Sequence, residues 1–241
     1  MMPEQYEKRS YRCDDLVRII EILRSPEGCP WDRAQDHHSI RNNFLEEAYE
    51  AVEAIDREDT ALLCEELGDV LLQIVLHTQM EAERGHFDFG DVCTGICCKM
   101  IGRHPHVFGG EQAADAEAAA QSWEEQKRRE KGLYSLEDRL RQVSMALPAL
   151  MRAQKLTVRA STAGCDVEPD NEEIRAAMEQ ALNGGEAEAS QRWGRLLFML
   201  CERMSQCGVA AEEALSNESD RMIIRFLEMQ HSEAPDGDHT L

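Results

Sequence analysis

Several features that common protein classes require are scarce or absent in this sequence of 241 residues. It contains no apolar run of 18 or more residues, so we expect no membrane-spanning helix. The segment "MMPEQYEKRSYRC" lacks the apolar core of a signal peptide, and we therefore expect a soluble protein that is not exported. Aromatic residues make up only 5% of the chain and alternating strand patterns are missing, which argues against a β fold.

Positive charge is also scarce, because 26 Lys and Arg residues are outnumbered by 47 Asp and Glu, for a formal net charge of -21. Nucleic acids and anionic membranes need a positive surface, so we expect neither as a partner. The nine cysteines include no CxxC pair, and adjacent Cys97 and Cys98 lie in a helical pattern. This favours reduced thiols in a cytoplasm over a disulfide framework or a zinc site.

Apolar residues recur at steps of three and four almost throughout, which predicts an all-α fold. The first half is expected to form helices over 14–24, 39–57, 61–83 and 89–102, the size of a bundle. "SPEGCPWD" is expected to be a turn, Ser39 and Thr60 to be N-caps, and Gly85 to close the third helix. The second half predicts helices near 148–160, 171–183, 188–206 and 209–230.

The two halves resemble each other, which predicts two tandem four-helix modules. "GDVLLQIVLHTQM" from Gly68 aligns with "GRLLFMLCERM" from Gly194, and Lys99 and Arg103 correspond to Arg221 and Arg225. The alanine-rich, charged stretch 111–132 carries Trp123 as its only large apolar residue and is expected to be a solvated helix. We place an N-terminal module at 1–110, a helical linker at 111–135, a C-terminal module at 136–230 and a disordered tail at 231–241.

Acidic residues gather on two of the expected helices. In "NNFLEEAYEAVEA", residues 42–54, the acids Glu46, Glu47, Glu50 and Glu53 occupy one arc, which alone is typical of a solvated helix face. The next helix is apolar nearly all round and is expected to be buried, and carboxylates on a buried helix are costly unless a cation neutralises them. Glu65 is expected to be a surface charge.

Two acidic pairs are spaced by three residues, Glu47 with Glu50 and Glu66 with Asp69, so each pair lies on one helix face. A short turn and an antiparallel return would bring the four carboxylates together. Such an all-oxygen set suits Mg²⁺ or Mn²⁺. Bundles that bind iron typically carry Glu-x-x-His pairs, which are missing here, so magnesium is favoured.

A cationic cluster follows in "CKMIGRHPH", where Lys99 and Arg103 are one helical turn apart and precede His104 and His106. A metal held by carboxylates is a common partner for phosphate oxygens, and the forked donors of Arg103 suit phosphate. The alternative is that Lys99 and His106 are surface charges that balance nearby acids.

The residues from "GCPWDRAQDHHSIRNNFLEEAYEAVEAID" to "RHPHVF" closely resemble the MazG family of nucleoside triphosphate pyrophosphohydrolases. The family hallmark is EExxE, a gap, and then ExxD. The likeness is dense over about residues 14–109, continues through "SWEEQKRREK" and "LPALMRAQK", and then thins. It implies an all-α fold, homodimers or higher assemblies, Mg²⁺ dependence, and hydrolysis of a (d)NTP to the monophosphate and pyrophosphate.

Carried over by position, the resemblance implies four metal ligands: Glu47, Glu50, Glu66 and Asp69. Glu46 either holds a metal or orients the attacking water.

The resemblance also implies a substrate-binding set. Lys99 and Arg103 match the phosphate-contacting basic positions of the family, and His104 follows them directly. Trp31, in "CPWD", either stacks near a base or is a structural plug in a loop.

The second half departs from the family pattern. Opposite Glu66 and Asp69 it has Arg192 and Arg195, and cations at these positions would repel Mg²⁺. This predicts a degenerate, catalytically dead C-terminal module that supports dimerisation or adds its own arginine pair to an anion pocket. Two further hypotheses stay open: a non-catalytic nucleotide sensor or protein-binding regulator, and an iron-containing storage or redox bundle.

Overall fold

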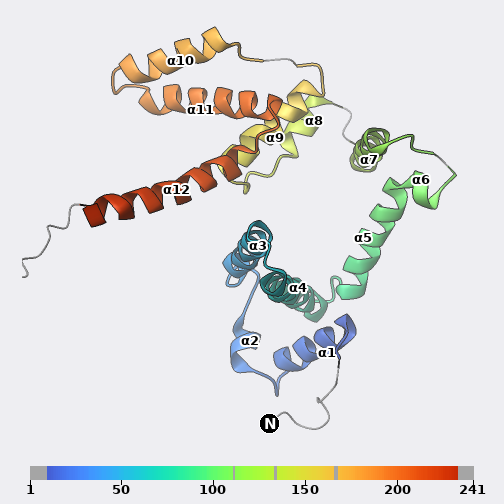
Figure 1. Cartoon of the computed structure of the whole chain (residues 1–241). Coiled ribbons are helices and arrows are strands. Elements are labelled where there is room, and N and C mark those ends of the chain that lie inside the picture. Colours follow the sequence, from blue (N-terminus) through green and yellow to red (C-terminus); the bar gives the residue numbers. More distant parts are fainter. Residues whose placement is uncertain (1–9, 111, 133–134, 166–167, 233–241) are drawn as a thin grey trace, which may run out of the picture. The chain divides into compact units, whose positions relative to one another are not determined.

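The computed structural model describes residues 10–110, 112–132, 135–165 and 168–232 (Figure 1). Across these ranges the chain forms twelve α-helices and no β-strand, so the all-α prediction is confirmed. The chain divides into two compact units, Met1–Trp123 and Glu124–Leu241, each with a buried apolar cluster of its own. The finer division into two four-helix modules and a linker stays a prediction.

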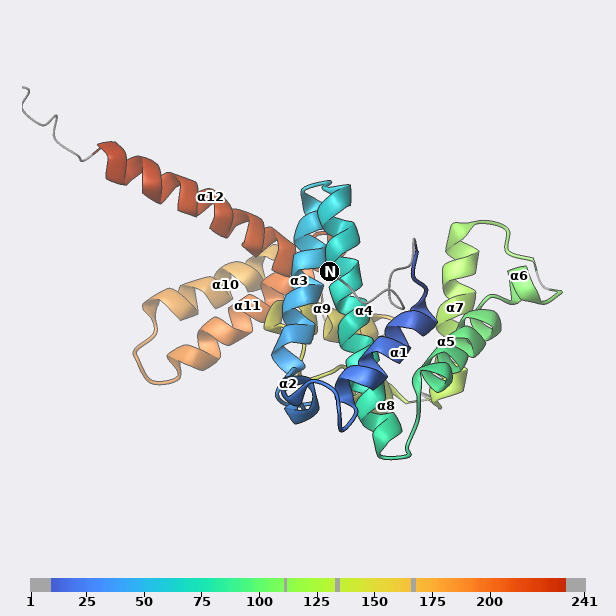
Figure 2. The ribbon, with the colours of Figure 1, turned by 90° about the horizontal axis from the view of Figure 1, so that it is seen from below.

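The first unit is built around two antiparallel helices, α3 (Arg41–Asp56) and α4 (Thr60–Glu83). The short turn 57–59 joins them, and they lie side by side along most of their length (Figures 1 and 2). α1 (Cys13–Arg24) packs on α4, and α5 (Phe89–Arg103) follows from the end of α4. Two short helices complete this part, α2 (Pro30–Ala34) and α6 (Pro105–Phe108), and α2 lies where a turn was expected.

The core of the first unit lies where α1 meets the second half of α4. Its buried members are Ile20, Ile40, Val75, Leu76 and Met80. Nearer the start of α4, Leu67 is 54% exposed. The expectation that α4 is buried on nearly all sides is therefore wrong for its first half, because the apolar cluster includes α4 residues only from Leu71 onward.

Two predicted helix caps are wrong by one residue. The N-cap of α4 is Asp59 and not Thr60, because the Asp59 carboxylate accepts hydrogen bonds from two backbone N–H groups of the first turn. Ser39 does not cap α3 either, since its hydroxyl accepts from the backbone N–H of Asp36 instead. Gly85 adopts a left-handed φ of 73° and ends α4, as predicted.

The second unit contains α8 (Leu136–Arg141), α9 (Ala149–Ser161), α10 (Asn171–Asn183), α11 (Ala189–Gln206) and α12 (Ala211–Ser232). α11 packs on α9 and α10, and α12 packs on α9, so all four expected helices of this half are present. The Gln154 side chain on α9 holds the start of α12, because it donates to the carbonyl of Val209 and accepts from the N–H of Ala211, both at 2.8 Å. The expected disordered tail, 231–241, lies outside the described residues apart from its first two, which end α12.

The stretch 111–132 does form a helix, α7 (Ala116–Lys131). The expectation that this helix is solvated throughout is wrong for Trp123, which is half-buried and contacts the end of α5. Across the described ranges, none of the helices combines the length and apolar character needed to cross a membrane.

Candidate functional site

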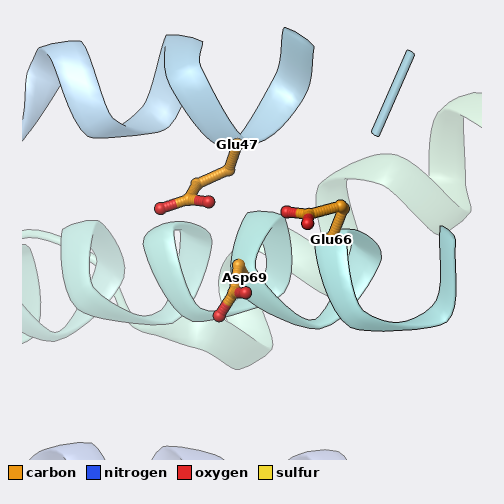
Figure 3. Close-up of side chains that lie close together, drawn as sticks. All are labelled: Glu47, Glu66 and Asp69. Atoms are coloured by element: carbon orange, nitrogen blue, oxygen red, sulfur yellow. The ribbon is translucent and has the colours of Figure 1, made fainter. Parts of the chain in front are cut away.

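Three acidic side chains of α3 and α4 lie close together, and we call Glu47, Glu66 and Asp69 the acidic trio (Figure 3). Glu47 belongs to a stripe on α3 that recurs at three and four residues and includes the buried Ala51 and Ala54. This stripe therefore faces α4. Glu66 and Asp69 lie one turn apart on α4, and each places a carboxylate oxygen within 4.8 Å of one from Glu47.

The geometry of the acidic trio is compact. Each side chain offers one carboxylate oxygen, and these three oxygens all lie within 4.8 Å of one another. All three residues are half-buried. Across the described residues this is the only group in which three potential metal-ligating atoms all lie this close together, and it contains no histidine, unlike the sites of iron-binding bundles.

The electrostatics of the trio are those of like charges held together. Partial burial raises the pKa of Glu47, and the charges of Asp69 and Glu50 raise it further. Partial burial, followed by the charges of Glu50 and Asp69, raises the pKa of Glu66 as well. The ionised trio is therefore unfavourable on its own, and a cation would relieve it. Carboxylate oxygens at this spacing fit a hard divalent cation.

The fourth expected ligand, Glu50, is exposed on α3 and is not part of the trio. It nevertheless lies close enough to hydrogen-bond Glu47 and to act electrostatically on Glu66. Glu46 is exposed, as is Glu65, whose charge also raises the pKa of Glu66. The structure thus brings three of the four expected ligands together and places Glu50 beside them.

The expected substrate-binding residues occupy different environments. Lys99 is exposed on α5, whereas Arg103 at the end of α5 is only 7% exposed. The Arg103 guanidinium carbon lies 5.1 Å from the ring centroid of Trp123 on α7. Trp31 is 65% exposed on α2.

His104 also belongs to the group around Trp123. Its Nδ1 donates to the carbonyl of Met100 at 2.6 Å, and its ring packs edge-on against Trp123 with centroids 4.9 Å apart. The Nδ1–H is thus committed to the backbone, which leaves Nε2 for any ligand. The sequence interpretation did not include Trp123 in the site; its only signal was a large aromatic residue in an otherwise polar helix.

The second unit has arginines where the first unit has acids. Arg192, which aligns with Glu66, donates to the backbone carbonyls of Gly185 and Ala187, the latter at 2.8 Å. It thereby holds the loop between α10 and α11. Arg195, which aligns with Asp69, is exposed on α11.

The chain is similar to known nucleotide pyrophosphohydrolases. Residues 35–108, which span the acidic trio and the end of α5, match the family model of the MazG nucleotide pyrophosphohydrolase domain. The nucleoside triphosphate pyrophosphohydrolase of Escherichia coli (strain K12) is 38% identical over 234 residues, which cover 93% of this chain and 89% of the relative.

Two further relatives are similar. The nucleoside triphosphate pyrophosphohydrolase/pyrophosphatase MazG of Thermotoga maritima is 37% identical over 229 residues, covering 93% of this chain and 88% of the relative. The nucleoside triphosphate pyrophosphohydrolase of Mycobacterium tuberculosis is 32% identical over 217 residues, covering 89% of this chain and 64% of the relative. With identity at this level over nearly the whole length, this chain belongs to the MazG nucleotide pyrophosphohydrolase family.

Proposed function

We propose that this protein is a nucleoside triphosphate pyrophosphohydrolase that converts a (d)NTP and water to the (d)NMP and pyrophosphate. The observation that supports the proposal is the acidic trio, whose three oxygens lie within 4.8 Å of one another, close enough to hold a divalent cation, inside the region that matches the family model. In the reaction a water oxygen forms a bond to the α-phosphorus, the bond from that phosphorus to the α,β-bridging oxygen breaks, and pyrophosphate leaves.

The acidic trio, together with the neighbouring Glu50, would hold Mg²⁺, with Mn²⁺ as a substitute. When bound, the cation supplies positive charge to the triphosphate oxygens and lowers the pKa of a water. Glu46, exposed next to Glu47 on α3, is assigned to orienting the attacking water.

The basic residues of α5 would neutralise the charge that develops on the phosphates. Lys99 is exposed, and the long stem of a lysine side chain would let its ammonium group meet an incoming triphosphate. Arg103 is different, because its guanidinium packs against the Trp123 ring. This contact restricts the side chain before substrate binds, so less conformational entropy is lost on binding. His104 would add a donor from Nε2, and Trp31 would either stack near the base or stabilise its own loop.

The second unit would be non-catalytic. Arg192 is engaged with backbone carbonyls, and a cation at this position opposes the binding of Mg²⁺. The unit would support assembly into a homodimer or a higher homo-oligomer, or contribute Arg221 and Arg225 to an anion pocket. On α3, exposed apolar residues also suit a subunit interface: Leu45, Tyr49 and Val52 are 52%, 58% and 51% exposed.

One alternative function is favoured by the arginines of the second unit. A regulator that kept the fold but lost turnover would bind a nucleoside triphosphate with Mg²⁺ and release no pyrophosphate.

The experiment is to incubate the purified protein with Mg²⁺ and a panel of canonical and modified NTPs, and to quantify pyrophosphate and orthophosphate separately. The proposal expects pyrophosphate and the nucleoside monophosphate in equal amounts. Release of orthophosphate as the first product would contradict attack at the α-phosphorus, and binding without any release would favour the regulator.

A further inference from the structure

A second network of titratable side chains lies outside the acidic trio. His37, in the segment that enters α3, places its Nδ1 2.7 Å from Nδ1 of His77 on α4. The other ring nitrogen of His37, Nε2, lies 2.6 Å from a carboxylate oxygen of Glu81, also on α4. Glu81 is held from two further directions, by Nδ1 of His86 at 2.7 Å and by a guanidinium nitrogen of Arg84 at 2.8 Å.

The two facing ring nitrogens stay in contact only while one of them, and not both, carries a proton. At 2.7 Å they share a single N–H. When His37 donates from Nε2 to Glu81, its Nδ1 accepts from His77. One added proton still leaves a single N–H between the rings, whereas a second added proton places an N–H on both nitrogens and forces them apart. Consistent with this, burial and the charge of His37 lower the pKa of His77.

The two rings also form a packed structural unit. They stack with centroids 5.0 Å apart and an interplanar angle of 6°. Phe44 of α3 packs edge-on against His77 at 5.9 Å. Charged groups lie on each element that carries or clamps this unit, namely α4, the loop after it, the segment before α3 and α1: Glu81, Arg84, His86, Asp36, His38 and Arg24.

The segment that carries His37 is clamped from α1 as well. The Arg24 side chain, only 6% exposed, donates twice to Glu83 at 2.8 and 2.9 Å. A third nitrogen of Arg24 donates to the carbonyls of Asp32 at 2.5 Å and Gln35 at 3.2 Å. These bonds hold the backbone before His37 against the end of α4.

The network lies along the same helix pair as the acidic trio. On α4, His77 follows Asp69 by eight residues, a distance of about 12 Å along the helix axis. On α3, Phe44 precedes Glu47 by one turn. The turn 57–59 joins the end of α3 to α4, and the histidine pair joins the segment before the start of α3 to α4. Glu47 therefore lies between two points at which this part of the chain is fixed to α4.

We propose that the His37–His77 pair is a positioning device that fixes the start of α3 against α4 and so holds Glu47 in the acidic trio. Glu81 orients His37 for this contact. The effect on cation affinity rests on the proposed function of the trio, whereas the effect on the order of α3 does not.

The test uses two substitutions of His77 that differ in one polar atom. In His77→Asn the side-chain amide takes the place of Nδ1 and keeps the hydrogen bond to His37. In His77→Leu the apolar volume is kept but this hydrogen bond is lost. Amide hydrogen exchange in residues 41–48 should accelerate about fivefold in His77→Leu, as expected for one lost hydrogen bond, and stay near wild type in His77→Asn. The Kd for Mg²⁺ alone, measured by calorimetry, should rise by a similar factor only in His77→Leu.

A second readout separates positioning from packing. The protection factors of the amides in 41–48, which correct for the pH dependence of intrinsic exchange, should fall in the wild type when acidification adds a second proton to the facing nitrogen pair, whereas those of His77→Asn should not respond. His38→Gln, in the same segment and exposed, is the matched control and should behave as wild type. His37→Leu breaks the same link and should repeat the result if His77→Leu fails to fold. Wild-type exchange in the Leu variants would overturn the proposal; altered exchange with unchanged Mg²⁺ affinity would overturn only its connection to the trio.

Discussion

The guanidinium of Arg103 lies against the ring of Trp123, 5.1 Å from guanidinium carbon to ring centroid, although the two residues belong to different helices. Arg103 is 7% exposed, so the position of its charge is set by packing rather than by solvent. The tryptophan thus takes part in the candidate site by holding a residue proposed to contact phosphate.

Replacing Trp123 with Leu should weaken substrate binding without unfolding the first unit. The substitution keeps an apolar side chain but removes the aromatic face, a loss of about 1 kcal/mol. We expect KM to rise by roughly threefold to fivefold with a small change in kcat. Steady-state kinetics measure both, and circular dichroism checks the helix content. An unchanged KM would show that Arg103 does not depend on Trp123.

Replacing Glu66 with Gln should abolish stabilisation by Mg²⁺ while leaving the cation-free protein at least as stable as wild type. The substitution removes a carboxylate whose own pKa is raised by its surroundings, and with it one of the like charges that raise the pKa of Glu47. Thermal unfolding with and without Mg²⁺ measures both effects. Glu65→Gln, at the adjacent exposed position, is the matched control and should retain the Mg²⁺ response.

The stabilisation by Mg²⁺ should grow with pH. Because the pKa values of Glu47 and Glu66 are raised, the cation-free folded state binds protons more readily than the unfolded chain. Their favourable contribution is therefore present below the ordinary glutamate pKa and is lost as the pH rises through the raised values. Mg²⁺ offsets that loss, so its Tm shift should be larger at about pH 8 than at about pH 5. A shift of equal size at both pH values would contradict this account.

The contribution of Glu81 to stability should depend on pH in the opposite direction to that of Glu47 and Glu66. Hydrogen bonds from His86 and then His37 lower its pKa to about 2. This contribution is complete above the ordinary glutamate pKa and is lost as the pH falls toward 2. Urea unfolding of Glu81→Gln should show lower stability than wild type at neutral pH, and the difference should shrink on acidification. A difference that is constant with pH would contradict the assignment.

The helices were predictable from the sequence because their apolar residues follow the helical period and their ends carry strong signals. Gly85 ends α4 with a left-handed φ of 73°, as glycine readily does. The exact caps were less predictable, since Asp59 and Thr60 are adjacent and both are good N-cap residues. Local sequence does not decide between them.

The acidic trio was predictable because helical spacing and a short turn are both local properties. The rotation of α3 about its axis is not local, and it leaves Glu50 exposed beside the trio rather than within it. The contacts of Trp123 with Arg103 and of His37 with His77 also depend on tertiary packing. Residues 37 and 77 are 40 positions apart, and no periodic pattern connects them.

The most direct test of the account is the rate of pyrophosphate release from a nucleoside triphosphate with Mg²⁺, compared between the wild type and Asp69→Asn. The substitution keeps the size of the side chain and removes one charge of the acidic trio. The account predicts a loss of about a thousandfold in rate with the helix content retained. A rate equal to that of the wild type would contradict the assignment of the trio as the catalytic cation site.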